Sequence, residues 1–266
     1  MRLLKLDGAD ELSFVEFSRV DIPPYAILSH TWGSEEVIFK DIANKTGKGK
    51  AGHDKIRFCG EQSARDGYQY FWVDTCCIDK SNNTELTESI NSMFRWYQNA
   101  AKCYVLLADV SSPNSDADAQ ANQSTWEVSF RRSKWFTRGW TLQELIAPTS
   151  VEFFSLQHKR LGDKKSLEKQ IHEITGIPTQ ALRGNPFSSF KVDERMEWAI
   201  KRQTTKEEDE AYCLLGICEV SMPLVYGEGK VRALYRLRKE VIESSKHING
   251  PKPQEGTASI FQFDLY

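Results

Sequence analysis

The sequence of 266 residues lacks the regular cysteine spacing of a disulfide framework or a zinc ribbon. No two of its six cysteines form a CxxC pair. It also lacks an apolar run of about 18 residues, and its first residues reach a charged side chain before a signal-peptide core could form. These absences argue against a secretory signal and a membrane-spanning helix. We therefore expect a cytoplasmic protein in a reducing compartment, with no membrane partner.

An excess of charge of one sign is also missing. The 35 lysines and arginines almost balance the 37 acidic residues, and the formal net charge is -2. This balance gives no reason to expect nucleic acid or an anionic membrane as a partner. The hydrophobic fraction of 40% is enough to build a core. A charged ligand would therefore have to be bound by a local group of side chains.

Four short apolar runs predict buried strands, and the segments between them have the spacing of amphipathic helices. A parallel strand pair needs a crossover connection, so this alternation predicts an α/β fold with an open, mostly parallel sheet flanked by helices. The polar stretch that follows the third run has nothing to bury and predicts an exposed loop at 111–123. Strands are expected at 25–32, 70–78, 102–110 and 150–155, helices at 54–67 and 84–102 (with Thr84 as the cap), and extra C-terminal helices at 164–177, 209–217 and 226–245.

Polar and reactive side chains follow the first two apolar runs. In an open parallel sheet, ligands bind beyond the carboxyl ends of the strands, so these side chains would converge on one rim. Each also has a structural interpretation. His30 could be a hydrogen-bonded structural histidine, Asp74 and Asp79 could bind backbone amides in turns, and Cys76 and Cys77 could pack on opposite faces of the strand. The side chains in question are Ser29, His30, Thr31, Trp32 and Gly33, and then Asp74, Thr75, Cys76, Cys77 and Asp79.

The stretch WFTRGWTLQELIAP, residues 135–148, combines two indoles with a single acid. A helix over 139–147 places its aliphatic side chains on one side, and Trp140 and Glu144 on the other. An indole one turn before a carboxylate would desolvate the acid, raise its pKa and offer a flat surface on which a ring can stack. Arg138 could bind a phosphate or a carboxylate. The alternative is a surface helix that carries one ordinary glutamate.

Metal and phosphate motifs are weak in this sequence. The spacing of His30, His53, Cys59 and Cys77 is too irregular for a typical zinc site, so no metal is expected. YGEGK at 226–230 resembles a phosphate-binding turn but lacks the full GxxxxGK[ST] pattern, and a plain turn at a helix start explains it equally well. The sequence therefore predicts no tightly bound cofactor.

Three blocks, YAILSHTWG, FWVDTCCIDK and RGWTLQELIAP, together resemble the signature of the fungal heterokaryon incompatibility (HET) domain. SINSMFRWY, DEAYCLLGI and PLVYGEGK also look like that family, so the resemblance covers roughly residues 1–240. It is greatest to HET domains that precede a nucleotide-binding oligomerisation module and WD repeats, which are therefore expected partners in a full-length protein. We expect a HET domain at 1–244, with a core at about 20–180, and a tail or linker at 245–266.

The family resemblance implies a cell-death effector that acts when genetically different hyphae fuse. HET domains are similar to TIR domains, which implies a TIR-like fold with the flavodoxin-like strand order. Enzymatically active TIR domains carry a catalytic glutamate on the corresponding helix and cleave the nicotinamide–ribose bond of NAD. By position, the resemblance gives that role to Glu144 and makes NAD a substrate. TIR domains without this activity also exist.

Two hypotheses follow from the sequence and the resemblance. In the first, NAD lies along the rim of the sheet, with Trp32 or Trp140 stacked on a ring and Arg138 or Lys80 near the diphosphate. In the second, the domain is a non-enzymatic homotypic signalling and oligomerisation module, in which self-association uses the helix that contains residues 91–97. The two can coexist. The residues expected to contact NAD are His30, Trp32, Gly33, Asp74, Asp79, Lys80, Arg138 and Trp140.

Overall fold

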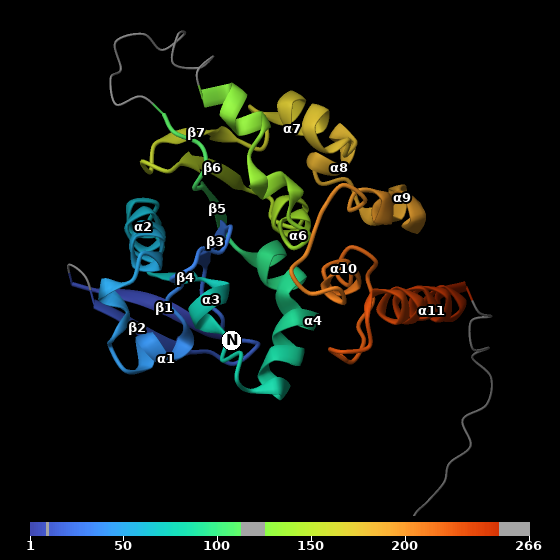
Figure 1. Cartoon of the computed structure of the whole chain (residues 1–266), viewed down its shortest axis with the longest axis horizontal. Helices are drawn as coiled ribbons and strands as arrows, with labels where there is room; N and C mark the ends of the chain where they lie inside the picture. Colours follow the sequence, from blue (N-terminus) through green and yellow to red (C-terminus); the bar gives the residue numbers. More distant parts are fainter. Residues whose placement is uncertain (9–10, 113–125, 250–266) are drawn as a thin grey trace, which may run out of the picture.

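A single mixed sheet runs through the computed structural model, which describes residues 1–8, 11–112 and 126–249. Seven described strands form it in the order β2-β1-β4-β3-β5-β6-β7 (Figure 1). Only the inner strands were expected, because the outer ones have no continuous apolar run. The strands are β1 (Arg2–Asp7), β2 (Glu11–Glu16), β3 (Tyr25–His30), β4 (Tyr70–Trp72), β5 (Lys102–Leu107), β6 (Val151–Ser155) and β7 (Arg160–Asp163).

The four inner strands, β4, β3, β5 and β6, are parallel to one another. In chain order they lie 2-1-3-4, which is the flavodoxin-like arrangement. Antiparallel strands flank them: the hairpin of β1 and β2 pairs with β4, and β7 pairs with β6. All six residues of β3 are buried, as a central parallel strand covered on both faces requires. The predicted α/β class and the mostly parallel inner sheet are confirmed.

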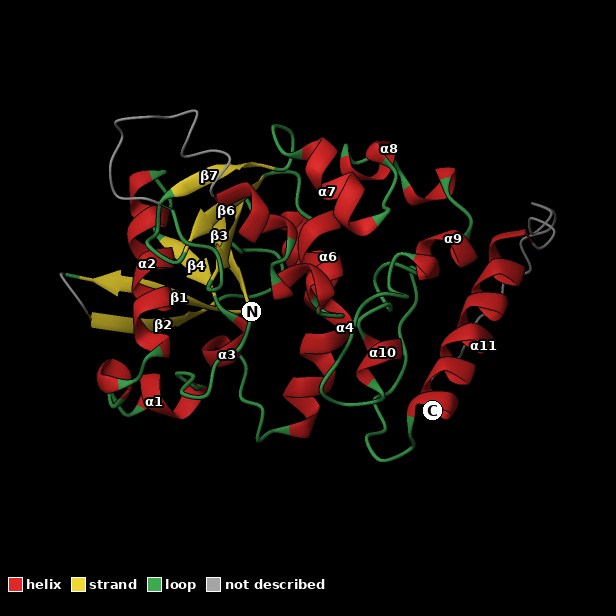
Figure 2. Cartoon of the chain, turned by 45° about the horizontal axis from the view of Figure 1, so that its top comes forward, coloured by secondary structure: helices red, strands yellow, loops and turns green. Residues whose placement is uncertain are grey.

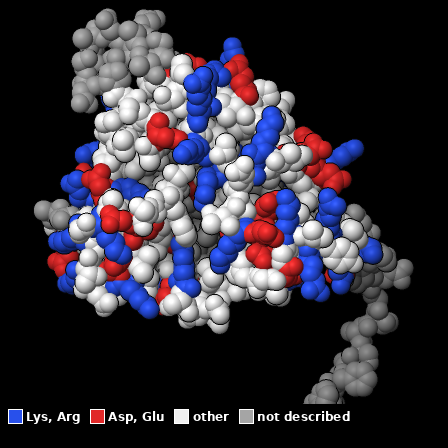
Figure 3. All heavy atoms as spheres, in the orientation of Figure 1, with Lys and Arg blue, Asp and Glu red and all other residues white. Residues whose placement is uncertain are grey.

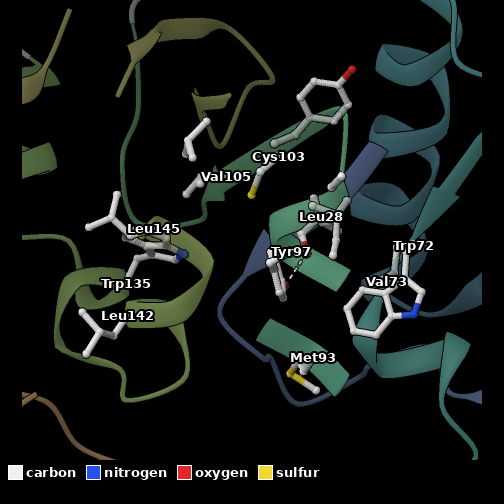
Figure 4. Packing of buried hydrophobic residues seen from close by; sticks show 14 of the residues in the cluster. Leu28, Trp72, Val73, Met93, Tyr97, Cys103, Val105, Trp135, Leu142 and Leu145 are labelled. Atoms are coloured by element: carbon white, nitrogen blue, oxygen red, sulfur yellow. Dashed lines mark hydrogen bonds between the residues drawn. The ribbon is translucent and has the colours of Figure 1, made fainter. Parts of the chain in front are cut away.

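Helices cover both faces of the sheet (Figure 1). α2 (Gly52–Arg65) packs on one face, where the ring of Phe58 meets Tyr104 and Phe154 edge-on. α4 (Asn83–Asn99) and α6 (Thr141–Ile146) lie on the other face. Figure 4 shows this second layer, in which the Tyr97 hydroxyl of α4 donates to the carbonyl oxygen of Leu28 at 3.0 Å. The remaining helix before α2 is α1 (Phe39–Ala43).

The expected strand at 70–78 ends after Trp72, and the next residues form the short helix α3 (Asp74–Cys77). Cys76 and Cys77 therefore do not lie on opposite faces of a strand; both are buried in one helical turn. The cap of α4 also differs from the prediction. The side chain of Asn82 accepts hydrogen bonds from the first backbone amides of that helix, so Thr84 is not the cap.

The C-terminal part of the described chain is helical, as expected. Figure 2 shows α11 at the edge of the molecule farthest from the sheet. α11 continues to Asn249, so the boundary expected at residue 245 falls inside a helix. The loop expected at 111–123 lies, except for 111 and 112, outside the described residues, as do residues 250–266. The helices here are α7 (Glu168–Thr175), α8 (Thr179–Leu182), α9 (Val192–Glu197), α10 (Asp209–Tyr212) and α11 (Lys230–Asn249).

None of the helices in the described ranges is both long enough and apolar enough to cross a membrane. On the face shown in Figure 3, lysine and arginine side chains alternate with acidic ones, in keeping with the formal net charge of -2.

Candidate functional site

The topology of the sheet makes the boundary between β3 and β5 the candidate position for a ligand. The chain leaves β3 through α2 to reach β4 on one side, and then returns through α4 to β5 on the other side of β3. Strand order therefore reverses between β3 and β5, and ligands of such sheets bind in the crevice at this switch point. α6 covers it: Ser29 of β3 donates a hydrogen bond to Oε2 of Glu144, and the Cys103 thiol of β5 lies 3.8 Å from the Glu144 carbonyl oxygen.

Glu144 is a buried acid. Its exposed fraction is 7%, and every residue of α6 is buried, so the interpretation of this segment as a surface helix is wrong. Burial raises the pKa of Glu144 to about 8. The hydrogen bond from Ser29 opposes that rise, the negative charge of Asp74 adds to it, and the positive charges of Arg202 and Arg138 reduce it. The carboxyl group therefore carries a proton for most of the time at neutral pH.

The indole close to this acid is Trp135. Its Nε1 donates to the Oγ of Ser29 at 2.8 Å, so Trp135, Ser29 and Glu144 form one hydrogen-bonded chain. Trp140 is only half-buried, and its Nε1 donates to Oδ2 of Asp209 in α10 at 3.1 Å. Figure 4 shows Trp135 beside Leu142 and Leu145. Helical spacing predicted that Trp140 lies close to Glu144, but the indole that is bonded to its partner Ser29 is Trp135.

Arg202 is a further buried residue of this region, and no sequence motif pointed to it. The Nη1 of Arg202 donates to the Arg138 carbonyl oxygen and to the Thr141 hydroxyl, both at 2.9 Å. Arg138 lies just before α6, and Thr141 is the first residue of α6. Its Nη2 is buried without a hydrogen-bond partner among the described residues. Burial lowers the pKa of Arg202 to about 10. The guanidinium therefore fixes the start of α6 and keeps a positive charge near Glu144.

A second cluster of predicted residues gathers around Asp74, the first residue of α3. The Trp32 indole donates to Oδ2 of Asp74 at 2.9 Å, and the Lys80 ammonium lies 3.7 Å from the same oxygen. The Lys80 nitrogen also lies 3.6 Å from the centroid of the Trp32 ring, which is a close cation–π contact. Trp32 is 52% exposed. This cluster therefore offers an open aromatic face flanked by a cation and an anion.

His30 belongs to the same cluster but is deeply buried. Its Nε2 lies 3.3 Å from Oδ1 of Asp74, without the alignment of a hydrogen bond. Burial lowers the pKa of His30 to about 3, and the charges of Lys55 and Lys80 act in the same direction, so the imidazole is neutral. Neighbouring strand residues point to opposite faces. His30 therefore faces the layer of α2, whereas Ser29 and Glu144 lie on the face covered by α6.

Two predicted site residues make local contacts instead. Asp79 accepts hydrogen bonds from the Ser81 amide at 3.0 Å and from the Ser81 hydroxyl at 2.6 Å, the arrangement of a turn-forming aspartate. The amide of Gly33 donates to Oε1 of Glu36 at 2.5 Å. The side chain of Arg138 contributes a positive charge near Glu144, while its carbonyl oxygen binds Arg202.

The YGEGK turn binds a carboxylate of the protein itself. The amides of Gly227 and Gly229 donate to Oε1 of Glu208 at 2.7 and 3.0 Å, in the way that such a turn would hold a phosphate. It is therefore a structural turn at the start of α11. Within the described ranges, no three histidine, cysteine or acidic side chains come together as a potential metal site.

Two surface pockets lie away from Glu144. A groove of about 640 Å³ follows the exposed side of α4, and a second pocket of about 310 Å³ lies beside β2 and α1. The lining of the first includes Arg19, Thr87, Glu88, Ser92 and Arg95.

Comparison with known proteins identifies the family. The model of the family described as "Heterokaryon incompatibility protein (HET)" matches residues 25–124. The chain is also similar to vegetative incompatibility protein HET-E-1 of Podospora anserina, with 59% identity over 244 residues. That similarity covers 91% of this chain and 18% of the relative, so the chain spans less than a fifth of the relative's length. No solved structure matches the chain. The expected resemblance is confirmed: this chain carries a fungal heterokaryon incompatibility (HET) domain.

Proposed function

We propose that this chain is an effector domain of fungal vegetative incompatibility that triggers cell death in the cytoplasm. The name of the Podospora anserina relative supports the incompatibility role. The six cysteines are all free and buried, in keeping with a reducing compartment. In the full-length protein the effector would act together with a nucleotide-binding module and WD repeats, and its own self-association would bring several copies together.

The reaction that we propose is the hydrolysis of NAD at its nicotinamide–ribose bond. The observation that carries this proposal is the buried Glu144 at the β3–β5 switch point, held by a neutral serine hydroxyl and with a raised pKa. A perturbed acid at the position where this kind of sheet binds ligands is typical of an active site. The similarity of HET domains to TIR domains gives the same residue the same role.

The charge of the substrate fits the state of the acid. The nicotinamide ring of NAD is cationic, and a positive charge beside a carboxyl group favours its ionised form. Binding would therefore release the proton of Glu144. The resulting carboxylate would stabilise the positive charge that develops on the ribose as the glycosidic bond breaks. Water adds to the ribose carbon, neutral nicotinamide leaves with the bonding electron pair, and the water's second proton goes to solvent.

The second cluster of the site would hold the rest of the dinucleotide. Trp32 has the exposed ring face, and its contact with Lys80 places a cation where a diphosphate can reach it. Arg138 is the alternative cation for the diphosphate. Asp74 orients both Trp32 and Lys80 and would therefore act by positioning them.

Nicotinamide release tests this proposal. Purified protein at high concentration is incubated with NAD, and wild type is compared with Glu144→Gln. Glu152→Gln is the matched control, because it removes another buried carboxylate outside the site. We expect release from wild type and the control, and none from Glu144→Gln. No release from assembled wild type, or equal release from Glu144→Gln, would refute the enzymatic proposal.

One observation favours the second candidate function, a homotypic signalling module. The groove along α4 is open and polar, and Arg95 on its rim is exposed. In that case Arg95→Glu would abolish killing in a fungal cell-death assay and Glu144→Gln would leave it intact. Loss of killing by a folded Glu144→Gln protein would exclude a purely non-enzymatic module.

A further inference from the structure

We propose that Trp135 and Ser29 form a positioning pair that holds one carboxyl oxygen of Glu144 and leaves the other oxygen for the ligand. The catalytic consequence of this inference rests on the proposed NAD hydrolysis, but the geometry does not. Trp135 Nε1 donates to Ser29 Oγ, and Ser29 Oγ donates to Glu144 Oε2. All three residues are buried. Ser29 lies on β3, Trp135 in a short 3-10 helix at Lys134–Thr137, and Glu144 in α6, which follows that helix directly.

The chemistry of the three groups fixes the direction of the hydrogen bonds from Trp135 to Ser29 and from Ser29 to Glu144. An indole N–H can only donate, so the serine oxygen must accept from Trp135. The single hydrogen of the serine hydroxyl is then directed to Oε2 of Glu144. When Glu144 is neutral, its proton therefore lies on Oε1, because Oε2 is the acceptor for Ser29. Oε1 is the atom that remains to give up a proton and to face a positively charged ligand.

Trp135, the first donor of this hydrogen-bonded chain, is held rigidly by the core. The Trp135 ring is 1% exposed and packs edge-on against Phe153 of β6, with centroids 5.7 Å apart. Its carbonyl oxygen accepts the hydroxyl of Thr141, the first residue of α6. The indole, the strand β3 and the helix that carries the acid are thus tied together. Such support is what a preorganised carboxyl group requires.

The pair has a measurable effect that packing alone would not have. A hydrogen bond donated to a carboxylate favours its charged form. Ser29 therefore keeps the pKa of Glu144 lower than burial alone would make it. Without the hydroxyl the pKa should rise further, and the carboxyl group should lose its fixed orientation.

A carboxyl ¹³C NMR titration of glutamate-labelled protein tests the pair, with the Glu144 signal assigned from Glu144→Gln. We expect Ser29→Ala to raise the Glu144 pKa by about 1 to 2 units. Trp135→Phe keeps the ring packing but removes the indole N–H, and should raise the pKa by less. Ser63→Ala is the matched control, since its buried hydroxyl binds the Cys59 carbonyl oxygen in α2. A Ser29→Ala protein in which Glu144 has the pKa of wild type would overturn the inference. If Ser29→Ala does not fold, Trp135→Phe takes its place, and an unchanged Glu144 pKa in that variant would overturn the inference.

Kinetics separates the positioning role from the proposed function. If the domain cleaves NAD, Ser29→Ala should lower kcat with little change in KM and move the rising limb of the pH profile upward. Ser29→Thr, which keeps the hydroxyl, should restore both kcat and the position of the pH profile. An unchanged pH profile in Ser29→Ala would contradict the positioning role. The NMR titration needs no catalysis, so a shifted pKa in a domain that cleaves no NAD would refute the proposed function and leave the pair standing.

Discussion

Glu144 in helix α6 and Glu152 in the following strand β6 are both buried glutamates, yet their charges differ. Glu144 is 7% exposed and Glu152 is 9% exposed. Glu152 in β6 pairs with the Lys102 ammonium at 2.6 Å and with the Arg160 guanidinium at 3.0 Å. Burial alone would raise its pKa, but these two cations outweigh burial and lower it. Glu144 has a serine hydroxyl in place of a cation, and its pKa rises to about 8.

The difference between the two acids shows that the partner, and not burial itself, decides what a buried carboxyl group does. Two cations satisfy Glu152, which ties β6 to β5 and β7. Glu144 is held by one neutral donor, and among the described residues no lysine or arginine lies within ion-pair distance of it. An acid left in this state can exchange its proton when a cation binds. The comparison therefore marks Glu152 as a structural acid and leaves Glu144 as the candidate for chemistry.

Activity gives the largest expected contrast between the two acids. Glu144→Gln should reduce the rate of nicotinamide release by at least about 100-fold, because it removes the charge that the transition state needs. Glu152→Gln should change the rate of the folded protein little. Nicotinamide release per folded molecule measures both, with folding followed by circular dichroism. Comparable losses in the two variants would remove the distinction.

The pH dependence of stability should have opposite signs at the two sites. Between pH 4.5, the ordinary pKa, and about 8, folded Glu144 keeps a proton that the unfolded chain releases. Its contribution to stability therefore falls as the pH rises, by up to about 1.4 kcal/mol per pH unit. Glu152, with its lowered pKa, stabilises the fold above the ordinary value and loses that contribution as the pH falls through its folded pKa.

Urea unfolding at about pH 5.5 and about pH 7.5 measures this dependence. Glu144→Gln should gain stability relative to wild type as the pH rises across this range, since glutamine has no proton to lose. Glu152→Gln should show a constant difference from wild type there. A gap between Glu144→Gln and wild type that is independent of pH would mean that the acid is charged in the folded protein.

Stability at neutral pH gives a smaller contrast. Glu152→Gln should lower the free energy of unfolding by about 1 to 2 kcal/mol, because Lys102 and Arg160 lose a charged hydrogen-bond acceptor but remain partly exposed to water. Thermal and urea unfolding at neutral pH give this value. Lys102→Met is the matched control, since it breaks the same pair from the other side. A Glu152→Gln protein with the same free energy of unfolding as wild type would show that the ion pairs contribute nothing measurable to stability.

The fold could be predicted from the sequence where burial leaves a strong pattern. The inner strands are continuous apolar runs, and all of them were found. The outer strands β1, β2 and β7 were missed because only one or two residues of each are buried, which leaves no continuous apolar run in the sequence. The strand through 70–78 was predicted too long, since Val73, Cys76, Cys77 and Ile78 in and around α3 are buried like the residues of an inner strand.

The site could be predicted only in part, because its contacts join distant segments. The rule that ligands bind beyond strand ends brought together His30, Trp32 and Asp74, which the structure places in one cluster. Lys80, which was named only as a possible contact of the diphosphate, joins that cluster. Helical spacing singled out Glu144 as the candidate acid. Spacing cannot show that Trp135, and not Trp140, contacts Ser29 on the distant strand β3. Arg202 lies far along the chain from Glu144, and its role depends on tertiary contacts alone.

Trp140 and Trp135 give the smallest expected contrast, between a hydrogen bond that serves the fold and one that serves the candidate site. Trp140→Phe removes the donor to Asp209 and should cost about 1 kcal/mol of stability, as the loss of one hydrogen bond does. The pKa of Asp209, which burial raises, should rise further without this donor. The rate of nicotinamide release should stay within about threefold of wild type, since Phe keeps the ring and Glu144 keeps Ser29. Trp135→Phe makes the same chemical change on the chain that leads to Glu144, and its effect should appear in the pH profile of the reaction. If Trp140→Phe shifted that profile and Trp135→Phe did not, the acid would be coupled to the indole that directly precedes its helix and not to the one bonded to Ser29.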